Sequence, residues 1–201
     1  MAEGRGVTII FLNGCTSSGK SSIAAALQAR LVAPYLRMGI DDAFSTVPPK
    51  YHQHKEGFFF DRDERGLVRL NMGPVGRAAL RAHRHGASAA ARSGANLILD
   101  EVLLPGMLAD WLALLDGLDV FMAGVRCELG ELERREIARG DRMTGQARGQ
   151  FDLVHADVVY DIEVDTTRSD AEASAAAIAA KVESGTSADA VRRMRRLFTD
   201  K

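Results

Sequence analysis

The chain has 201 residues, of which 46% are hydrophobic and 26% are charged, and its formal net charge is −1. Such a chain is expected to fold as one globular domain with a sizeable core. The near-neutral charge argues against nucleic acid or membrane surfaces as partners, and the longest apolar runs are too short to span a bilayer. Because the N-terminus lacks a signal-peptide pattern, we expect a cytoplasmic protein.

The first predicted elements are a buried strand at residues 7–12 and a helix at residues 21–32. The loop between them, Gly-Cys-Thr-Ser-Ser-Gly-Lys-Ser, matches G-x-x-x-x-G-K-[ST] in full. Its two glycines allow a tight turn in which backbone N–H groups converge on a phosphate, and the helix dipole adds positive potential there. A chance Gly/Ser-rich turn is the alternative, and the flanking strand and helix argue against it.

The motif therefore predicts binding of a nucleoside triphosphate together with Mg²⁺. Lys20 supplies a positive charge for the β- and γ-phosphates, and the Ser21 hydroxyl can complete the coordination of the metal. The residues predicted to hold the nucleotide in this loop are Gly14, Cys15, Thr16, Ser17, Ser18, Gly19, Lys20, Ser21 and Ser22.

Two neighbouring carboxylates, Asp41 and Asp42, follow a second strand candidate at residues 35–40. Side chains alternate faces along a strand, so the two cannot serve the same purpose. The second strand of a kinase-type sheet ends near the γ-phosphate, where an ionised aspartate can accept the proton of an attacking hydroxyl. The pattern modestly favours Asp41 as this base and Asp42 as a cap for a short segment at residues 43–47.

The following segment, residues 48–65, is irregular and dense in aromatic and charged side chains. It is either a lid or pocket wall over the strand ends or an ordinary packed connection. Two pairs of histidines lie two residues apart: His52 with His54, and His83 with His85. Because neither pair has further metal ligands nearby, we expect these side chains on the surface rather than in a metal site. Cys15 and Cys127 are expected to be reduced.

Later elements continue the alternation of strands and helices. Helices are predicted at residues 74–93, 105–115, 129–139, 147–155 and 171–183, and strands at residues 96–99, 120–125 and 162–164. This order implies a parallel sheet covered on both faces. Asp100 ends one of the strands, where a carboxylate can hold Mg²⁺ directly or through water; orienting the acceptor or capping the next helix are the alternatives.

The helix at residues 129–139 carries a row of arginines. Arg135, Arg139 and Arg142 are spaced by four and three, so they share one face if the helix continues. Arginines on a closing lid can meet the negative charge that phosphoryl transfer spreads over the equatorial oxygens. The alternative is a solvated basic face that is paired with Glu131, Glu133 and Glu136, and the phosphate loop favours the lid.

Several segments together resemble the chloramphenicol phosphotransferase family. They are Leu-Asn-Gly-Cys-Thr-Ser-Ser-Gly-Lys-Ser-Ser, Gly-Ile-Asp-Asp, Leu-Asp-Glu-Val, Gly-Val-Arg-Cys, Ala-Arg-Gly-Asp-Arg and Tyr-Asp-Ile-Glu-Val-Asp-Thr-Thr. Their order and spacing match from about residue 7 to residue 182. The acceptor side, residues 48–65, does not fit the family pattern, so the substrate stays open.

The resemblance implies an α/β fold, the three-layer P-loop kinase fold, with a five-stranded parallel sheet, helices on both faces and a helical lid. It implies ATP-dependent transfer of the γ-phosphoryl group to a hydroxyl of a small molecule; the family's type acceptor is the 3-hydroxyl of chloramphenicol, which phosphorylation inactivates. The family's catalytic aspartate falls on Asp41 and its lid arginines on Arg135 and Arg139, which act beside Lys20. The predicted metal ligands are Ser21 and Asp100, and the loop that would hold adenine contains Thr166 and Thr167.

Two other functions remain as alternatives: a nucleotide-sugar kinase of the zeta-toxin type or a metabolite kinase, and a nucleotide-binding regulator. The guanine-reading Asn-Lys-x-Asp of switch GTPases is absent. We expect a kinase domain at residues 1–183 and a basic helical extension at residues 184–201. The apolar stripe of this extension is expected to dock on its own domain, with subunit pairing or an acidic partner as alternatives: Val191, Met194, Leu197 and Phe198.

Overall fold

The computed structural model describes residues 7–140, 143–185 and 188–199. Its centre is a five-stranded sheet in the order β2-β5-β1-β6-β7, in which every neighbouring pair is parallel. The strands are β1 (Ile9–Asn13), β2 (Tyr35–Gly39), β5 (Asn96–Glu101), β6 (Val120–Arg126) and β7 (Ile162–Asp165). The predicted α/β class and the five-stranded parallel sheet are confirmed.

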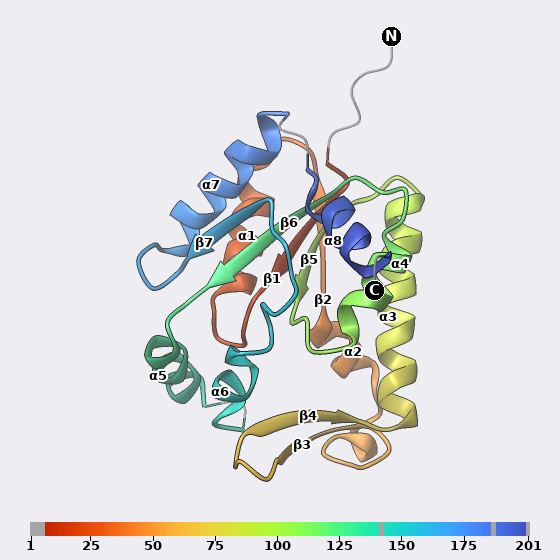
Figure 1. Ribbon diagram of the computed structural model, residues 1–201, viewed down its shortest axis with the longest axis vertical. Coiled ribbons are helices and arrows are strands. Elements are labelled where there is room, and N and C mark those ends of the chain that lie inside the picture. Colours follow the sequence, from red (N-terminus) through yellow and green to blue (C-terminus); the bar gives the residue numbers. More distant parts are fainter. Residues whose placement is uncertain (1–6, 141–142, 186–187, 200–201) are drawn as a thin grey trace.

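Helices cover both faces of the sheet, which gives three layers (Figure 1). One face carries α1 (Lys20–Arg30) and α7 (Ala171–Glu183), and the other carries α3 (Pro74–Arg92), α4 (Met107–Leu114) and α8 (Ala190–Thr199). Three further helices lie near the carboxyl ends of the strands: α2 (Ile40–Thr46), α5 (Leu129–Arg139) and α6 (Gln146–Phe151).

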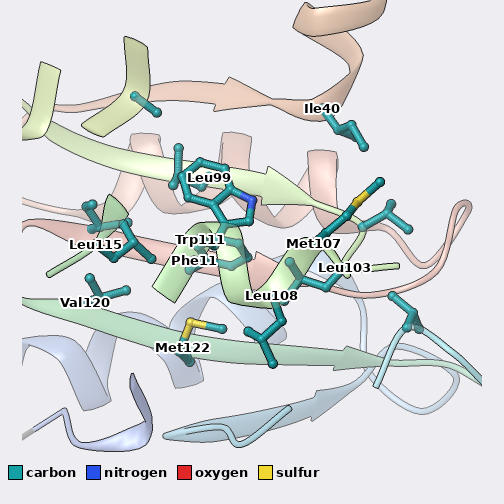
Figure 2. Packing of buried hydrophobic residues seen from close by; sticks show 14 of the residues in the cluster. Phe11, Ile40, Leu99, Leu103, Met107, Leu108, Trp111, Leu115, Val120 and Met122 are labelled. Atoms are coloured by element: carbon teal, nitrogen blue, oxygen red, sulfur yellow. The ribbon is translucent and has the colours of Figure 1, made fainter. Parts of the chain in front are cut away.

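The central strand β1 is buried on both faces because it separates two apolar cores. Ile10 and Leu12 pack with residues of α1 and α7, whereas Ile9 and Phe11 pack with residues of α3 and α4. The ring of Trp111 meets that of Phe11 edge-on with centroids 5.3 Å apart (Figure 2). These cores fix the sheet, so the carboxyl ends of the strands meet at one edge and can carry a common site.

Residues 48–65 were expected to be irregular, and that expectation is wrong for their second half. Phe58–Arg62 forms strand β3, which pairs antiparallel with β4 (Val68–Met72). The turn contains Gly66 with φ of +75°, and the Asp63 carboxylate accepts hydrogen bonds from its backbone N–H groups. Those bonds lower the pKa of Asp63. Three consecutive phenylalanines concealed the alternation that normally reveals such a hairpin.

Asp41 and Asp42 do not belong to a strand, because α2 begins at Ile40 immediately after β2. Strand alternation therefore does not separate their roles. The predicted helix at residues 147–155 is also shorter than expected, since α6 ends at Phe151 and a run of turns follows.

The prediction that His83 lies on the surface is wrong. Its side chain is buried on the inner face of α3, and its Nε2 is 2.7 Å from Glu101 Oε1. Burial raises the pKa of Glu101, and the neighbouring His83 opposes that shift. The histidine is thus a core residue paired with a carboxyl group at the end of β5.

The C-terminal helix α8 docks on its own domain, as preferred from the sequence. Ala190, Val191 and Met194 are buried, while Leu197 is 56% exposed. Arg195 donates a hydrogen bond of 2.6 Å to the carbonyl oxygen of Leu112 beside α4. The side chain of Phe198, the fourth member of the predicted stripe, lies outside the described part of the chain. Within that part, no helix combines the length and apolar character needed to cross a membrane.

Candidate active site

The phosphate loop connects β1 to α1, as the motif predicted. A Cβ at Gly14 would lie 2.5 Å from the carbonyl oxygen of Val125, so only glycine fits there. Gly19 adopts φ of +88° and precedes the first residue of α1, Lys20. Lys20 is buried, and its Nζ donates a 2.8 Å hydrogen bond to the Cys15 carbonyl oxygen. The lysine is therefore held over the loop by the loop's own backbone.

The loop offers unused hydrogen-bond donors, which suits a phosphate ligand. The Oγ atoms of Ser17 and Ser18 are buried and have no partner among the residues that the structure describes. Ser17 also adopts φ of +61°, a strained conformation for a residue with a side chain. A buried hydroxyl without a partner is costly, and a bound anion would satisfy it. Burial raises the pKa of Cys15 to about 11, so its thiol adds no negative charge, and neither cysteine is in a disulfide.

Ser21 and Asp100 come together as predicted for metal ligands. Ser21 Oγ donates to Asp100 Oδ2 at 2.6 Å, and Lys20 Nζ lies 3.9 Å from Asp100 Oδ1. Hydroxyl and carboxylate oxygens are hard ligands of the kind that Mg²⁺ prefers. Across the described ranges no cluster of three or more His, Cys, Asp or Glu residues could hold a metal. The pair thus fits an ion that takes its other ligands from phosphate and water.

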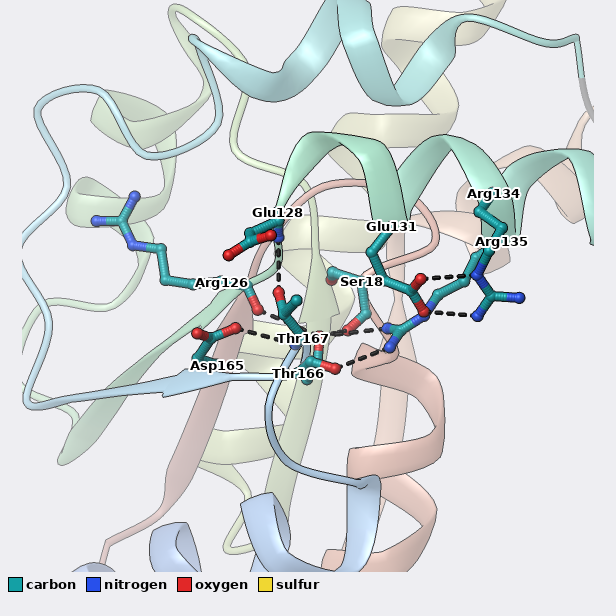
Figure 3. A network of polar contacts seen from close by, with 9 residues as sticks. All are labelled: Ser18, Arg126, Glu128, Glu131, Arg134, Arg135, Asp165, Thr166 and Thr167. Atoms are coloured by element: carbon teal, nitrogen blue, oxygen red, sulfur yellow. Dashed lines mark hydrogen bonds and ion pairs between the residues drawn. The ribbon is translucent and has the colours of Figure 1, made fainter.

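Arg135 of α5 reaches the phosphate loop through Thr166 (Figure 3). Its Nη2 donates to the Thr166 carbonyl oxygen at 2.8 Å, and the Thr166 hydroxyl donates to the Ser18 carbonyl oxygen at 2.9 Å. Thr167 accepts a hydrogen bond from the Glu128 N–H at 2.8 Å, at the start of α5. Neither threonine lines the cavity at the loop, so their contact with adenine stays a prediction.

Both interpretations of the arginine row describe part of α5. Arg134, Arg135 and Arg139 line the cavity at the phosphate loop. Arg134 and Arg135 are also paired with Glu131, whose pKa their hydrogen bonds lower to about 2. Arg142 lies outside the described residues.

The alternative interpretation, a solvated face, made Glu136 one of its exposed partners, but this residue is buried. Its carboxylate accepts hydrogen bonds from the N–H groups of Gly145 and Ala147 at 2.7 and 2.9 Å. This carboxylate connects α5 to the start of α6 through two hydrogen bonds.

Asp41 lies where two cavities adjoin. The first, of about 460 Å³, is lined by the phosphate loop, Asp100, the α5 arginines and Asp41. The second, of about 540 Å³, is lined by Asp41 and by residues of α2, the segment that leads into the hairpin, strand β3 and the α5–α6 region: Phe44, Gln53, Phe60, Gly140, Met143 and Gln146. Asp42 also lines the first cavity, but its Oδ2 accepts a 2.7 Å hydrogen bond from the Gly39 N–H. Asp42 thus supports the start of α2, while Asp41 borders both cavities.

A buried polar network lies beneath the loop. Asn13, the last residue of β1, donates to the Val154 carbonyl oxygen and to the Tyr160 hydroxyl, both at 2.7 Å. The Tyr160 hydroxyl also lies 2.6 Å from His155 Nδ1. Because a phenolic oxygen can accept two hydrogen bonds and donate one, this contact suits either neutral tautomer of His155. Burial and the charge of Arg126 lower the pKa of His155 to about 4, which agrees with a neutral ring.

The sequence pointed to the loop, the carboxylates and the arginines but missed part of the site. Arg37, Phe44, Phe60, Gln146 and Gln150 line the cavities and belong to no motif. The hairpin brings in Phe60 and α6 brings in the two glutamines, while β2 and α2 present the other two. No local signal identifies them.

A sequence profile of the family described as chloramphenicol phosphotransferase-like protein matches residues 7–183. Counterparts in two strains of Mycobacterium tuberculosis, provisionally named O-phosphotransferases, are 34% identical over 176 residues, which cover 83% of this chain and 77% of theirs.

Solved structures show the same fold at low identity. A sugar kinase from Janibacter sp. has a TM-score of 0.60 and 17% identity, with 92% of this chain and 98% of that chain covered. Shikimate kinase from Acinetobacter baumannii has a TM-score of 0.58 and 15% identity, with 90% and 95% covered.

Proposed function

The chain belongs to the chloramphenicol phosphotransferase-like family, and from that premise we propose that it transfers the γ-phosphoryl group of ATP to a hydroxyl of a small molecule. The observation that carries the proposal is Asp41, which borders both the cavity at the phosphate loop and the second cavity. A base in that position can serve an acceptor bound in one cavity and a donor bound in the other.

In the proposed reaction the acceptor hydroxyl attacks the γ-phosphorus while Asp41 takes its proton. The bond between the γ-phosphorus and the β–γ bridging oxygen breaks, and ADP leaves with that oxygen. Lys20 sits at the loop, and Arg135 and Arg139 line the same cavity. Their charges would offset the negative charge on the transferred group.

Ser21 and Asp100 would hold Mg²⁺, since they are 2.6 Å apart and present oxygen ligands. When bound, the ion neutralises charge on the β- and γ-phosphates. The positions of the loop glycines and of the unpartnered Ser17 hydroxyl support a nucleotide phosphate in the same cavity.

The acceptor that we propose is an antibiotic such as chloramphenicol or a hydroxylated metabolite. Support comes from the second cavity, where Phe44, Phe60 and Met143 provide apolar surface beside the Asp41 carboxylate. We also propose that the protein acts in the cytoplasm, that residues 1–183 form the kinase domain, and that residues 184–201 are an extension of it.

The test is incubation with Mg-ATP and a panel of acceptors, with mass detection of the products. The panel contains hydroxylated antibiotics, sugars and metabolite alcohols, and nucleotide sugars. We expect one added phosphoryl group on an antibiotic or metabolite. A phosphorylated nucleotide sugar would instead identify a kinase of the zeta-toxin type. Nucleotide hydrolysis that a protein partner stimulates, without an adduct on any acceptor, would overturn the proposal in favour of a regulator.

A further inference from the structure

Helix α6 contacts the phosphate loop through Gln150 and lines the second cavity with Gln146. Gln146 and Gln150 are four residues apart, so they share one face of the helix. Both line the cavity at the phosphate loop, and Gln146 also lines the second cavity with Asp41. The face therefore extends from the donor side of the site to the acceptor side.

The orientation of the Gln150 amide follows from its partner. Its Oε1 accepts a 2.7 Å hydrogen bond from the Thr16 N–H, within the phosphate loop. A backbone N–H can only donate, so the oxygen rather than the nitrogen of the planar amide must face the loop. The Gln150 Nε2 then points away from Thr16, and it has no hydrogen-bond acceptor in the described part of the chain. Two N–H donors are left for a ligand.

The helix that carries these donors is held firmly. The Ala147 N–H donates to the buried Glu136 carboxylate at 2.9 Å, and Arg69 of β4 donates to the Gly149 carbonyl oxygen. A Cβ at Gly149 would lie 1.9 Å from the Val68 carbonyl oxygen, so helix and strand are in close contact. Donors fixed in this way lose little freedom when they bind a ligand.

We propose that Gln150 binds the terminal phosphoryl group of the nucleotide through its side-chain N–H donors. The inference rests on the proposed function and adds a residue that lies outside the G-x-x-x-x-G-K-[ST] motif. In this arrangement the loop amides and the start of α1 would receive the inner phosphates, and the face of α6 that carries Gln146 and Gln150 would meet a group that moves toward the second cavity. Gln150 is thus suited to distinguish a triphosphate from a diphosphate.

The test compares the affinities of the full-length protein for Mg-AMP-PNP and for Mg-ADP, measured by calorimetry. Gln150→Leu removes both hydrogen-bonding groups, and Gln150→Glu retains an acceptor for the Thr16 N–H while removing the donors. We expect both variants to bind AMP-PNP about tenfold to a hundredfold more weakly, as for a lost hydrogen bond to a charged group. The affinity for ADP should stay within about twofold of the native value in Gln150→Leu, while in Gln150→Glu, whose carboxylate also repels the phosphates, it should fall less than the affinity for AMP-PNP. Gln28→Glu on α1, whose side chain contacts the Tyr35 carbonyl oxygen, is the matched charge control.

Three results would overturn the inference. If the variants lose affinity for AMP-PNP and for ADP equally, Gln150 supports the loop without binding the terminal phosphoryl group. If Gln150→Glu retains the native affinity for AMP-PNP, the donors are not used. If the native protein binds neither nucleotide, the proposed function fails as well. If the native protein binds both and the variants keep the native ratio of the two affinities, only the role of Gln150 is refuted. Thermal unfolding of each variant identifies losses that come from misfolding.

Discussion

Acidification should destabilise the protein through His155, the histidine beneath the phosphate loop. The pKa of His155 is lowered from 6.5 to about 4, first by burial and then by the charge of Arg126. The other charges that act on it are Glu163, which raises the pKa, and Lys20, which lowers it. The unfolded chain therefore binds a proton at a higher pH than the folded protein does. Stability is fully present above pH 6.5, falls as the pH drops through this window, and levels off near pH 4.

The magnitude follows from the two pKa values. Their difference of about 2.5 corresponds to at most about 3.4 kcal/mol of folding free energy. Because His155 is only partly buried, solvent screening reduces this figure to about 2 kcal/mol. His155→Gln removes the titration, while the glutamine oxygen can still accept a hydrogen bond from the Tyr160 hydroxyl.

The assay is urea unfolding of the native protein and of His155→Gln at about pH 7 and about pH 4.5. Trp111, the one tryptophan of the chain, is fully buried and reports unfolding by its fluorescence. Because pH 4.5 lies above the folded pKa, only part of the full effect develops, and we expect the native protein to lose about 1.4 kcal/mol more than the variant on acidification. Equal losses would refute the reasoning. So would an NMR titration of the His155 ring with a midpoint near its ordinary value.

Three further variants probe the site. Gly149→Ala would force a Cβ against the Val68 carbonyl oxygen of β4, so urea unfolding should show a loss of about 1–3 kcal/mol, and unchanged stability would argue against the close contact of α6 with the hairpin. Arg135→Lys retains the charge but loses the forked contact with Thr166. Steady-state kinetics should give a kcat at least about tenfold lower with little change in the KM for the acceptor. An unchanged kcat would show that the arginine does not act in the transition state. Ser21→Ala should raise the Mg²⁺ concentration for half-maximal transfer by about tenfold, and an unchanged Mg²⁺ requirement would show that Ser21 is not a metal ligand. Chelation of Mg²⁺ should abolish transfer by the native protein.

Much of the fold is predictable because its signals are local. The apolar runs of the sheet strands and the loop motif each occupy a short stretch, and their order implies a parallel sheet. The hairpin was missed because Phe58–Phe60 has no alternation, although its second strand, Val68–Met72, and Gly66 in the turn carry the usual pattern. His83 was misassigned because its partner Glu101 lies on another element, beyond the reach of spacing arguments.

The site, like the fold, was predicted from the sequence where its signals are local and missed where they depend on distant contacts. The phosphate loop was predicted from eight consecutive residues, whereas Gln150 reaches Thr16 across 134 positions of sequence. Strand alternation predicted that Asp41 and Asp42 serve different purposes, and the position next to the strand end together with the family resemblance favoured Asp41; alternation does not apply in α2. In the structure a different contact distinguishes them, since the Asp42 carboxylate accepts a hydrogen bond from the Gly39 N–H. Such contacts depend on how a chain turns after a strand, which composition and periodicity do not specify.

The central claim is that Asp41 is the general base of a hydroxyl phosphotransferase. The most direct measurement is the rate of phosphoryl transfer by native protein, Asp41→Asn and Asp42→Asn to an acceptor that the panel identifies, together with the affinity of each for Mg-AMP-PNP. We predict that Asp41→Asn slows transfer by roughly a hundredfold to ten-thousandfold with nucleotide affinity unchanged, and that Asp42→Asn has a much smaller effect. Full loss in Asp42→Asn with activity retained in Asp41→Asn would contradict the account.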